Sequence, residues 1–251
     1  MSRVLVLCYH GVSASWPSDL AVAPERLERQ LSLLTGRGYR GATFMDAVTA
    51  PAAERTLAVT FDDAYRSVLE LALPVLASLG LPGSVYVPTA FPGSERPMSW
   101  PGIEEWVGTP HESELACMSW DELGSLAERG WEVGSHTVSH PRLTELGDAE
   151  LEEELAGSRA QAERALGRPC ESIAYPYGDV DDRVARAAAA AGYRAGGTLP
   201  GAFEPPSPIR WPRVGVYRGD ASWRYRLKVS RPLRAVRSSP AWRAVDRLRR
   251  D

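Results

Sequence analysis

Short apolar runs alternate with stretches of helical periodicity along most of the chain. Six runs are bounded by glycine, proline or polar residues, at 4–9, 41–44, 57–61, 84–88, 132–135 and 172–175. Their near-continuous apolarity is typical of strands that are covered on both faces of a parallel sheet. Two more segments, 196–199 and 213–217, fit further strands.

Helical patterns fill the intervals between these runs, at 24–34, 65–79, 120–128, 148–166 and 181–191. Ser119, with Glu122 three residues later, predicts a capped helix start at residue 120. Repeated strand–helix units predict an α/β fold with a parallel sheet, either open or closed. About seven strands in a chain of this length favour a small distorted (β/α) barrel. Its chemistry should follow the carboxyl ends of the strands.

The segment 91–118 has no clear periodicity and contains Trp100, Trp106 and His111. It is too long for an idle loop in a compact domain, so we expect a lid or a substrate wall. His111 is expected at the surface or in contact with substrate, and not as a metal ligand.

Polar side chains that could carry chemistry follow two of the predicted strands. Asp62 and Asp63 end the run 57–61, where the simpler interpretation is that one of them caps the next helix. His136 and His140 lie four residues apart in a turn after another strand. A turn that directs two imidazoles to one point suits a divalent metal. Two histidines and one carboxylate leave coordination positions open, as catalytic sites require.

A third candidate is the sequence Tyr175-Pro176-Tyr177-Gly178 at the end of another strand. It fits a plain turn with aromatic packing. It equally fits a pocket wall that offers a backbone N–H to an oxyanion.

The order Thr-Phe-Asp-Asp, Ser-His-Thr-x-x-His-Pro and Tyr-Pro-Tyr-Gly resembles the first three motifs of the polysaccharide deacetylases, carbohydrate esterase family four. The resemblance covers roughly residues 1–217. It implies a distorted (β/α) barrel of about seven strands. It also implies removal of acetyl groups from N-acetylated sugars with one divalent metal ion.

Carried over by position, the resemblance implies Asp63, His136 and His140 as metal ligands and Asp62 as the general base. It implies that the backbone N–H of Tyr177 helps to hold the oxyanion. The ligand set suits zinc, although cobalt, nickel or iron would also bind.

The chain departs from the family pattern in two places. Many members carry, at the position of Ala174, an arginine that orients the catalytic aspartate. We expect Arg213, or failing that Arg210, to supply the guanidinium, unless both arginines belong only to the basic tail. The family's late general-acid histidine is also missing, because no histidine follows His140. His10, at the end of the first strand, is expected to replace it, as a circular permutation would allow, and the alternative is a structural histidine.

The net charge of −3 conceals a strong segregation. Residues 1–208 carry 16 Arg against 29 Asp and Glu, whereas residues 209–251 carry 12 Arg and one Lys against 3 Asp. We therefore divide the chain into a catalytic domain, 1–217, and a basic extension, 218–251. The extension alternates apolar and cationic residues over 223–229, and a short helix is expected after Ser239-Pro240. Three interpretations are open: docking on the acidic body, peripheral contact with an anionic membrane, and nucleic-acid binding, the least favoured because no binding fold accompanies it.

Three scattered cysteines and no signal peptide or membrane span predict a cytoplasmic protein. We expect Cys8 to serve in packing. The most favoured function is metal-dependent deacetylation of an N-acetylated sugar, in a soluble metabolite or a lipid-linked glycan at the inner membrane face. The alternatives are hydrolysis of another amide or C–N bond and a catalytically silent carbohydrate-binding homologue.

Overall fold

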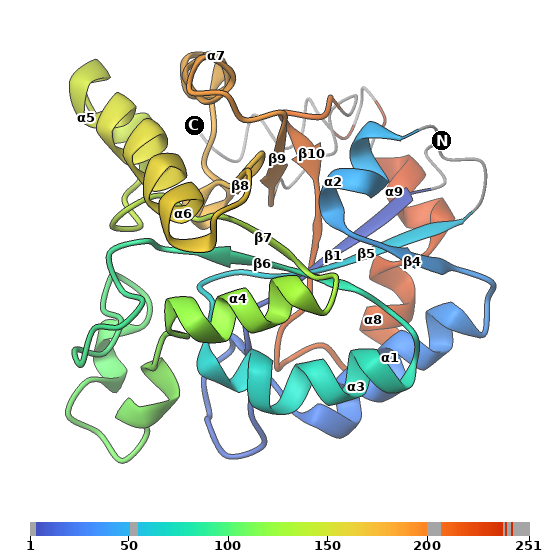
Figure 1. Cartoon of the computed structure of the whole chain (residues 1–251). Coiled ribbons are helices and arrows are strands. Elements are labelled where there is room, and N and C mark those ends of the chain that lie inside the picture. Colours follow the sequence, from blue (N-terminus) through green and yellow to red (C-terminus); the bar gives the residue numbers. More distant parts are fainter. Residues whose placement is uncertain (1–3, 51–54, 200–206, 238, 240–241, 243–251) are drawn as a thin grey trace.

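One sheet of parallel strands organises the chain (Figure 1). The computed structural model describes residues 4–50, 55–199, 207–237, 239 and 242. Eight strands follow one another around the sheet: β10 (Trp211–Pro212), β9 (Ala195–Thr198), β8 (Ser172–Ala174), β7 (Glu132–Ser135), β6 (Gly83–Val87), β5 (Thr56–Phe61), β1 (Val4–Tyr9) and β11 (Val214–Gly215). A ninth strand, β4 (Arg40–Ala42), pairs with β5, while β2 (Gly11–Val12) and β3 (Ala21–Val22) form a separate small sheet.

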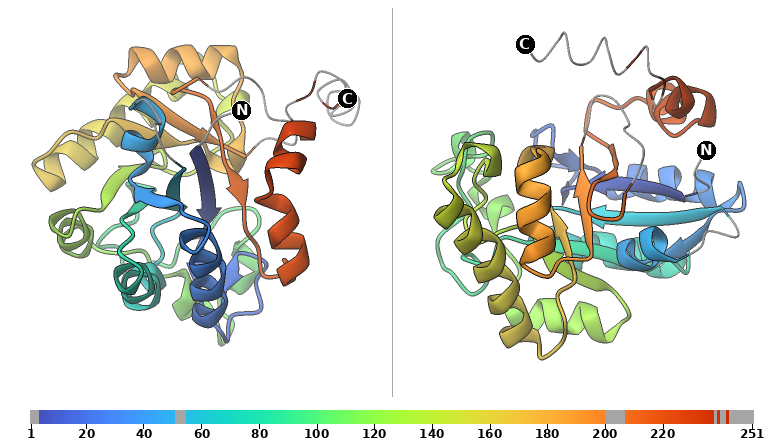
Figure 2. Two further views of the ribbon diagram at one scale, coloured as in Figure 1. Left: turned by 90° about the vertical axis from the view of Figure 1, so that its right-hand side faces the viewer. Right: turned by 90° about the horizontal axis from the view of Figure 1, so that it is seen from above.

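The two ends of this sheet are consecutive in the sequence. β10 pairs with β9, β11 pairs with β1, and only Arg213 separates the two short strands. The sheet is therefore a nearly closed barrel, and the predicted (β/α) barrel is confirmed (Figure 2). If β10 and β11 are taken as one strand interrupted at Arg213, seven strands surround the axis, as the sequence predicted.

Helices lie between the strands and cover the barrel: α1 (Pro24–Thr35), α2 (Phe44–Thr49), α3 (Leu73–Ser78), α4 (Trp120–Glu128), α5 (Asp148–Glu152), α6 (Ser158–Leu166) and α7 (Asp182–Ala190). α4 begins where the sequence predicted, because Ser119 and Glu122 form a complete capping box. The predicted helix 148–166 is continuous, with a π-helical segment, Glu153–Gly157, between α5 and α6.

The prediction of a strand over 41–44 was wrong at its end. Thr43 caps α2 by accepting a hydrogen bond from the backbone N–H of Asp46, so Phe44 begins a helix. The Phe44 side chain is buried, and its N–H donates to Ser84 Oγ at 2.8 Å. The apolar side chain of Phe44 extends the strand-like pattern of residues 41–44, but the capping Thr43 before it starts the helix.

The basic extension forms α8 (Ser222–Lys228) and α9 (Arg231–Arg237), which lie against the barrel beside α1 (Figure 2). Tyr225 and Val229 are buried in the main hydrophobic core, and the Tyr225 hydroxyl donates to the carbonyl of Gln30 at 3.1 Å. The docked part of the extension is held by apolar packing and by hydrogen bonds, such as that from Arg234 Nη1 to the carbonyl of Val4 at 3.2 Å. The helix expected after Ser239 falls mostly outside the described residues. Among the described helices, none is long and apolar enough to span a membrane.

Candidate active site

The carboxyl ends of four barrel strands bring the expected site residues to one cavity of about 490 Å³. His10 follows β1, and Asp62 and Asp63 follow β5. His136 and His140 come from the loop after β7, and Tyr177 from the turn after β8. All six line this cavity. Their convergence follows from the parallel sheet, which places the ends of neighbouring strands at one edge.

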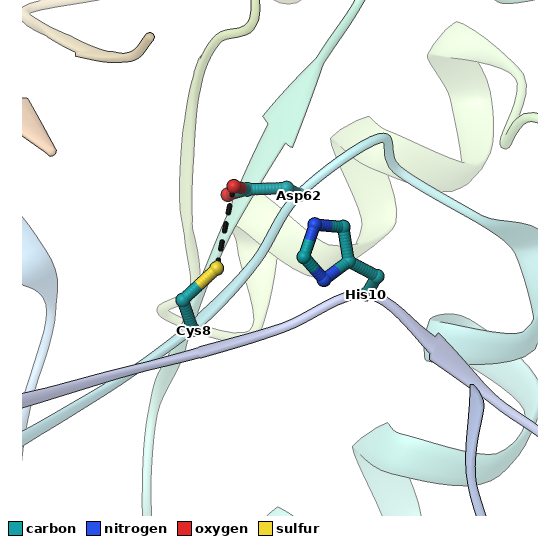
Figure 3. Close-up of side chains that lie close together, drawn as sticks. All are labelled: Cys8, His10 and Asp62. Atoms are coloured by element: carbon teal, nitrogen blue, oxygen red, sulfur yellow. Dashed lines mark hydrogen bonds between the residues drawn. The ribbon is translucent and has the colours of Figure 1, made fainter. Parts of the chain in front are cut away.

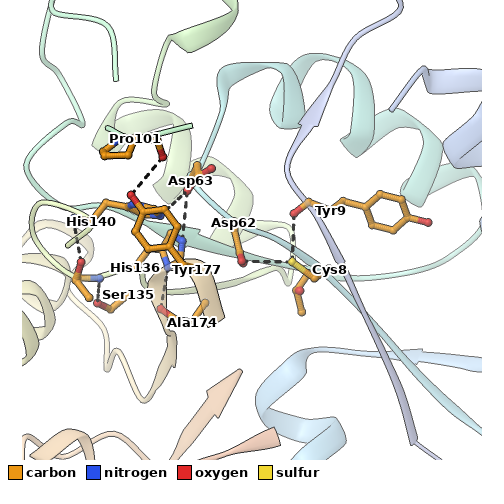
Figure 4. Close-up of polar contacts among 12 residues, drawn as sticks. Cys8, Tyr9, Asp62, Asp63, Pro101, Ser135, His136, His140, Ala174 and Tyr177 are labelled. Carbon is orange, nitrogen blue, oxygen red and sulfur yellow. Dashed lines mark hydrogen bonds and ion pairs between the residues drawn. The ribbon is translucent and has the colours of Figure 1, made fainter. Parts of the chain in front are cut away.

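Asp63, His136 and His140, which line the cavity, form one buried cluster (Figure 4). Asp63 Oδ1 lies 3.3 Å from His136 Nε2 and 3.5 Å from His140 Nε2. The three ligand atoms all lie within 4.8 Å of one another. Asp63 Oδ1 makes no hydrogen bond within the described part of the chain, although it is buried. A buried carboxylate oxygen without a donor is costly unless a cation faces it.

The imidazoles of this cluster are oriented as metal ligands require. His136 Nδ1 lies 2.8 Å from the carbonyl of Ala174, so Nδ1 carries the proton and Nε2 is left for a ligand position. Burial, aided by the charge of His136, lowers the pKa of His140 to about 3, which keeps that imidazole neutral. Burial acts to lower the pKa of His136, but its contact with Asp63 and the charge of Asp62 outweigh burial and raise that pKa. Two imidazole nitrogens and one carboxylate are a donor set that fits zinc or a similar divalent ion.

The backbone around this cluster is strained. Asp63, His140 and Tyr177 have φ angles of 69°, 65° and 59°, in the left-handed region that side chains rarely adopt. The turn that holds His140 is fixed by its own N–H, which donates to Thr137 Oγ1 at 3.1 Å. Such strain persists only where the surroundings hold it, and it concentrates at functional sites.

Asp62 lies in a different environment, although it is the neighbour of Asp63. Arg213 holds it with both arms of the guanidinium, Nη1 to Oδ1 at 2.7 Å and Nη2 to Oδ2 at 2.8 Å. Arg213 Nη1 also donates to Thr60 Oγ1 at 3.1 Å. Burial acts to raise the pKa of Asp62, but the Arg213 guanidinium outweighs it and holds that pKa well below its usual range. Arg210 instead pairs with Asp182 at 2.6 Å on the exterior.

The side chain of Arg213 therefore reaches the place where a guanidinium from position 174 would be expected to act. The residue at 174 is a fully buried alanine on β8, two barrel strands away from Arg213. Arg213 instead lies in the chain between β10 and β11.

His10 and Cys8, both from the end of β1, lie close to Asp62 (Figure 3). A ring nitrogen of His10, Cys8 Sγ and an Asp62 oxygen all lie within 4.8 Å of one another. His10 Nδ1 is buried and has no hydrogen-bond partner among the described residues. Burial lowers the pKa of His10, while the nearby carboxylates oppose this change. The ring also stacks on Tyr217 at a centroid distance of 6.3 Å.

Comparison with known proteins decides the family. The polysaccharide deacetylase family matches residues 49–196, which is more than half of the chain. The chain belongs to the polysaccharide deacetylase family. The resemblance drawn from its three motifs is thereby confirmed, whereas the circular permutation stays a prediction.

A curated relative and two solved structures agree with this membership. “Putative polysaccharide deacetylase YxkH” from Bacillus subtilis (strain 168) is 24% identical over 207 residues, 80% of this chain. The chain spans 66% of that relative's length, just under two thirds. BC0361, a polysaccharide deacetylase from Bacillus cereus, matches with a TM-score of 0.72 and 26% identity over 90% of this chain and 69% of its own. The Streptococcus pyogenes deacetylase PplD matches with a TM-score of 0.72 and 20% identity over 90% and 98% of the two chains.

The sequence did not predict two contacts in this member of the polysaccharide deacetylase family. The first is made by Cys8, which was assigned to packing. Its thiol donates to Asp62 Oδ2 at 3.3 Å, and burial raises the pKa of the thiol well above its usual value. The alternation of β1, which puts Cys8 on the same face as His10, was the available signal.

The second missed contact is made by Trp100. Its ring stacks on His140 at 4.2 Å between centroids, and Tyr177 packs on the same imidazole at 4.7 Å. Trp100 belongs to the irregular segment 91–118, and several residues of that segment line the cavity. His111 is not among them, and its ring instead contacts Trp106 at 5.7 Å.

Proposed function

We propose that this deacetylase-family chain hydrolyses the acetamide of an N-acetylated sugar with the help of one divalent metal ion. The observation that carries the proposal is that two adjacent carboxylates, Asp62 and Asp63, have different partners. Asp63 faces two imidazole nitrogens, whereas Asp62 is held by the Arg213 guanidinium beside that cluster. One carboxylate is thus available for a metal and the other for a proton.

Asp63, His136 and His140 would hold the metal. When bound, the ion would polarise the acetyl carbonyl and lower the pKa of water at the site. Asp62 takes the proton from the attacking water, and Arg213 keeps its carboxylate ionised and fixed in orientation. The Cys8 thiol also donates a hydrogen bond to the carboxylate of Asp62.

His10 supplies the proton that the departing amine needs when the C–N bond breaks. Its place beside Asp62 supports this assignment, because an imidazole that is not one of the two facing Asp63 is then available to the leaving group. The backbone N–H of Tyr177 is assigned to the oxyanion. No described residue accepts a hydrogen bond from it, and the positive φ of Tyr177 turns this peptide at the edge of the cavity.

The walls of the cavity suit a sugar. Trp100, Trp106 and Tyr177 offer apolar faces, while Asp19 and Glu105 offer acceptors for hydroxyl groups. We assign the substrate to N-acetylated sugars, free or in a glycoconjugate, and zinc as the metal. The predicted cytoplasmic location would restrict the substrate to a soluble metabolite or a lipid-linked glycan.

The test is acetate release by the metal-loaded full chain from N-acetylglucosamine, its oligomers and nucleotide- or lipid-linked forms. We expect acetate and free amine in equal amounts, loss of both in Asp62→Asn, and one divalent ion per chain by mass spectrometry. A chain that binds no divalent ion would contradict the proposal and favour a silent sugar-binding homologue. Metal binding with hydrolysis only of other amides would place the activity on another C–N bond.

A further inference from the structure

Helix α8 presents apolar side chains on two opposite faces. Tyr225 and Val229, four residues apart, are buried against the barrel. Trp223 and Leu227, also four residues apart, point away from it and are 68% and 49% exposed. With 100° per residue, the second pair lies almost opposite the first. The docking of α8 therefore leaves an apolar stripe uncovered by the described residues.

Exposed large hydrophobic residues are few in the described part of the chain, and most of them lie in the extension. The described part of the chain has five exposed large hydrophobic residues, and three of them lie in the extension: Trp223 and Leu227 on α8, and Val236 on α9. The other two, Leu71 and Val107, are isolated on the body. An apolar stripe on a short helix, rimmed by charge, marks an interaction surface.

Cationic side chains flank the stripe. Arg224 follows on one side and Arg226 on the other, both exposed. α8 lies beside α1 (Figure 1). On the Arg226 side, residues of both helices line a cavity of about 380 Å³, to which α1 contributes Arg26 and Arg29. Arg29 and Arg226 are exposed and form no ion pair with any described residue.

The acidic group of this cavity is already neutralised. Asp220 lines it, but its carboxylate accepts hydrogen bonds from Lys228 Nζ at 2.6 Å and from the N–H of Tyr217 at 3.0 Å. Arg26 donates to the carbonyl of Arg218, which fixes its guanidinium at the wall. The cavity is therefore a cationic recess directly beside an apolar stripe.

We propose that this surface, made of Trp223, Leu227, Arg226, Arg29 and Arg26, binds a bilayer that contains anionic phospholipid. The tryptophan and leucine enter the boundary between headgroups and acyl chains. The arginines neutralise lipid phosphates, each contributing about 1 kcal/mol near a charged surface, or about fivefold in partitioning. Charge complementarity selects the occupant, because an apolar protein partner would leave three arginines unpaired.

The position of the surface gives it a role for the enzyme. Immediately before α8, the N–H of Arg218 donates to the carbonyl of Asp19 at 2.8 Å, and Asp19 lines the catalytic cavity. Trp223 lies in the first turn of α8, close to that contact. The segment that leads into α8 thus contacts a loop that lines the catalytic cavity, so a bilayer bound at α8 would lie near that loop.

The test is flotation of the full chain with vesicles of phosphatidylcholine and phosphatidylglycerol in equal parts, against vesicles of phosphatidylcholine alone. We expect binding only to the anionic vesicles and weakening at high salt. Trp223→Ser and the pair Arg29→Gln with Arg226→Gln should each lower partitioning at least fivefold. Circular dichroism and unchanged hydrolytic activity on a soluble substrate would show that these exposed changes leave the fold intact.

Matched controls come from the body of the protein. Val107→Ser removes another exposed apolar residue, and Arg129→Gln removes an exposed cation, and neither should change flotation. The proposal is overturned if the unchanged chain ignores anionic vesicles, or if Trp223→Ser floats as well as Val107→Ser. It is also overturned if duplex DNA is bound with no effect of Trp223→Ser. The readout does not depend on deacetylation, so the two proposals fail separately.

Discussion

The candidate site contains two triads of potential metal ligands, and they differ in how the carboxylate of each is paired. Asp63, His136 and His140 form one, and Cys8, His10 and Asp62 form the other. Each is buried, and in each the potential ligand atoms lie within 4.8 Å of one another. Composition and spacing alone would rate both as metal sites.

The two triads differ in their contact with Arg213, which pairs with Asp62. Its guanidinium satisfies both oxygens of Asp62, so the second triad already contains its cation. The first triad has an Asp63 oxygen with no hydrogen-bond donor and two imidazoles turned toward it. We therefore propose a divalent ion only for the first triad, because Asp63 faces two imidazole nitrogens and has no guanidinium among the described residues to satisfy it. The types and spacing of the ligand residues therefore do not distinguish the proposed metal site from the proposed acid–base pair. The guanidinium beside Asp62 does.

The largest effect is expected from Asp63→Asn. Asparagine tolerates the positive φ of residue 63, so the backbone should persist while the metal loses its carboxylate ligand. Metal content should fall to background, and kcat/KM should fall by more than the roughly 10–100-fold that loss of an outer partner costs. Asp62→Asn is the matched control, and it should keep the metal while losing turnover. Equal loss of metal in Asp63→Asn and Asp62→Asn would contradict the assignment of the metal to the triad of Asp63 alone.

Removal of His10 should act on the other triad alone. His10→Ala is expected to lower kcat by about 10²–10⁴-fold with the metal content unchanged. A general acid must hold its proton, so activity falls as pH rises through the pKa of His10, which burial lowers. The alkaline limb of the kcat/KM profile should therefore lie below the usual histidine range and vanish in the variant. An alkaline limb that persists in His10→Ala would assign this histidine to structure.

Arg213→Met should reveal the ion pair as a stability effect. Removing one partner of a buried pair costs about 3–5 kcal/mol in the free energy of unfolding, and adding Asp62→Asn should restore most of it. In the parent protein the pKa of Asp62 is depressed, so its contribution is full at neutral pH and lost only in strong acid.

In Arg213→Met that pKa rises instead, and the loss of stability should shrink as the pH falls through it. Urea midpoints at neutral and acidic pH measure this. Additive losses in the double variant would contradict a coupled pair.

The smallest effect is expected at Cys8. Cys8→Ala removes one donor to Asp62, which is worth about 1 kcal/mol, or about fivefold in kcat. Cys8→Ser keeps a donor and should retain most of the rate, with metal content unchanged in both. If the serine variant is as slow as the alanine variant, the thiol serves packing, as the sequence alone had suggested.

Much of the fold was predictable, because strand and helix boundaries depend on local patterns. The strands β1 and β7 and the helix α4 occur at the predicted residues. Residues 41–44 show the limit of such patterns, since a capping threonine turned an apolar run into the start of α2. The alternation over 223–229 likewise did not reveal which side of α8 would be buried.

The sequence by itself determined the chemistry available and the family, because both are written in contiguous motifs: Asp62-Asp63, the His136–His140 pair and the Tyr177 turn. It could name Arg213 and His10 as candidates but could not place them. Only the tertiary structure decided that Arg213 pairs with Asp62, that Cys8 donates to the same carboxylate, and that Trp223 stays exposed. The physical reason is barrel closure: β11 beside β1, and β1 beside β5, join residues about 150 positions apart in the chain. No local pattern encodes that register.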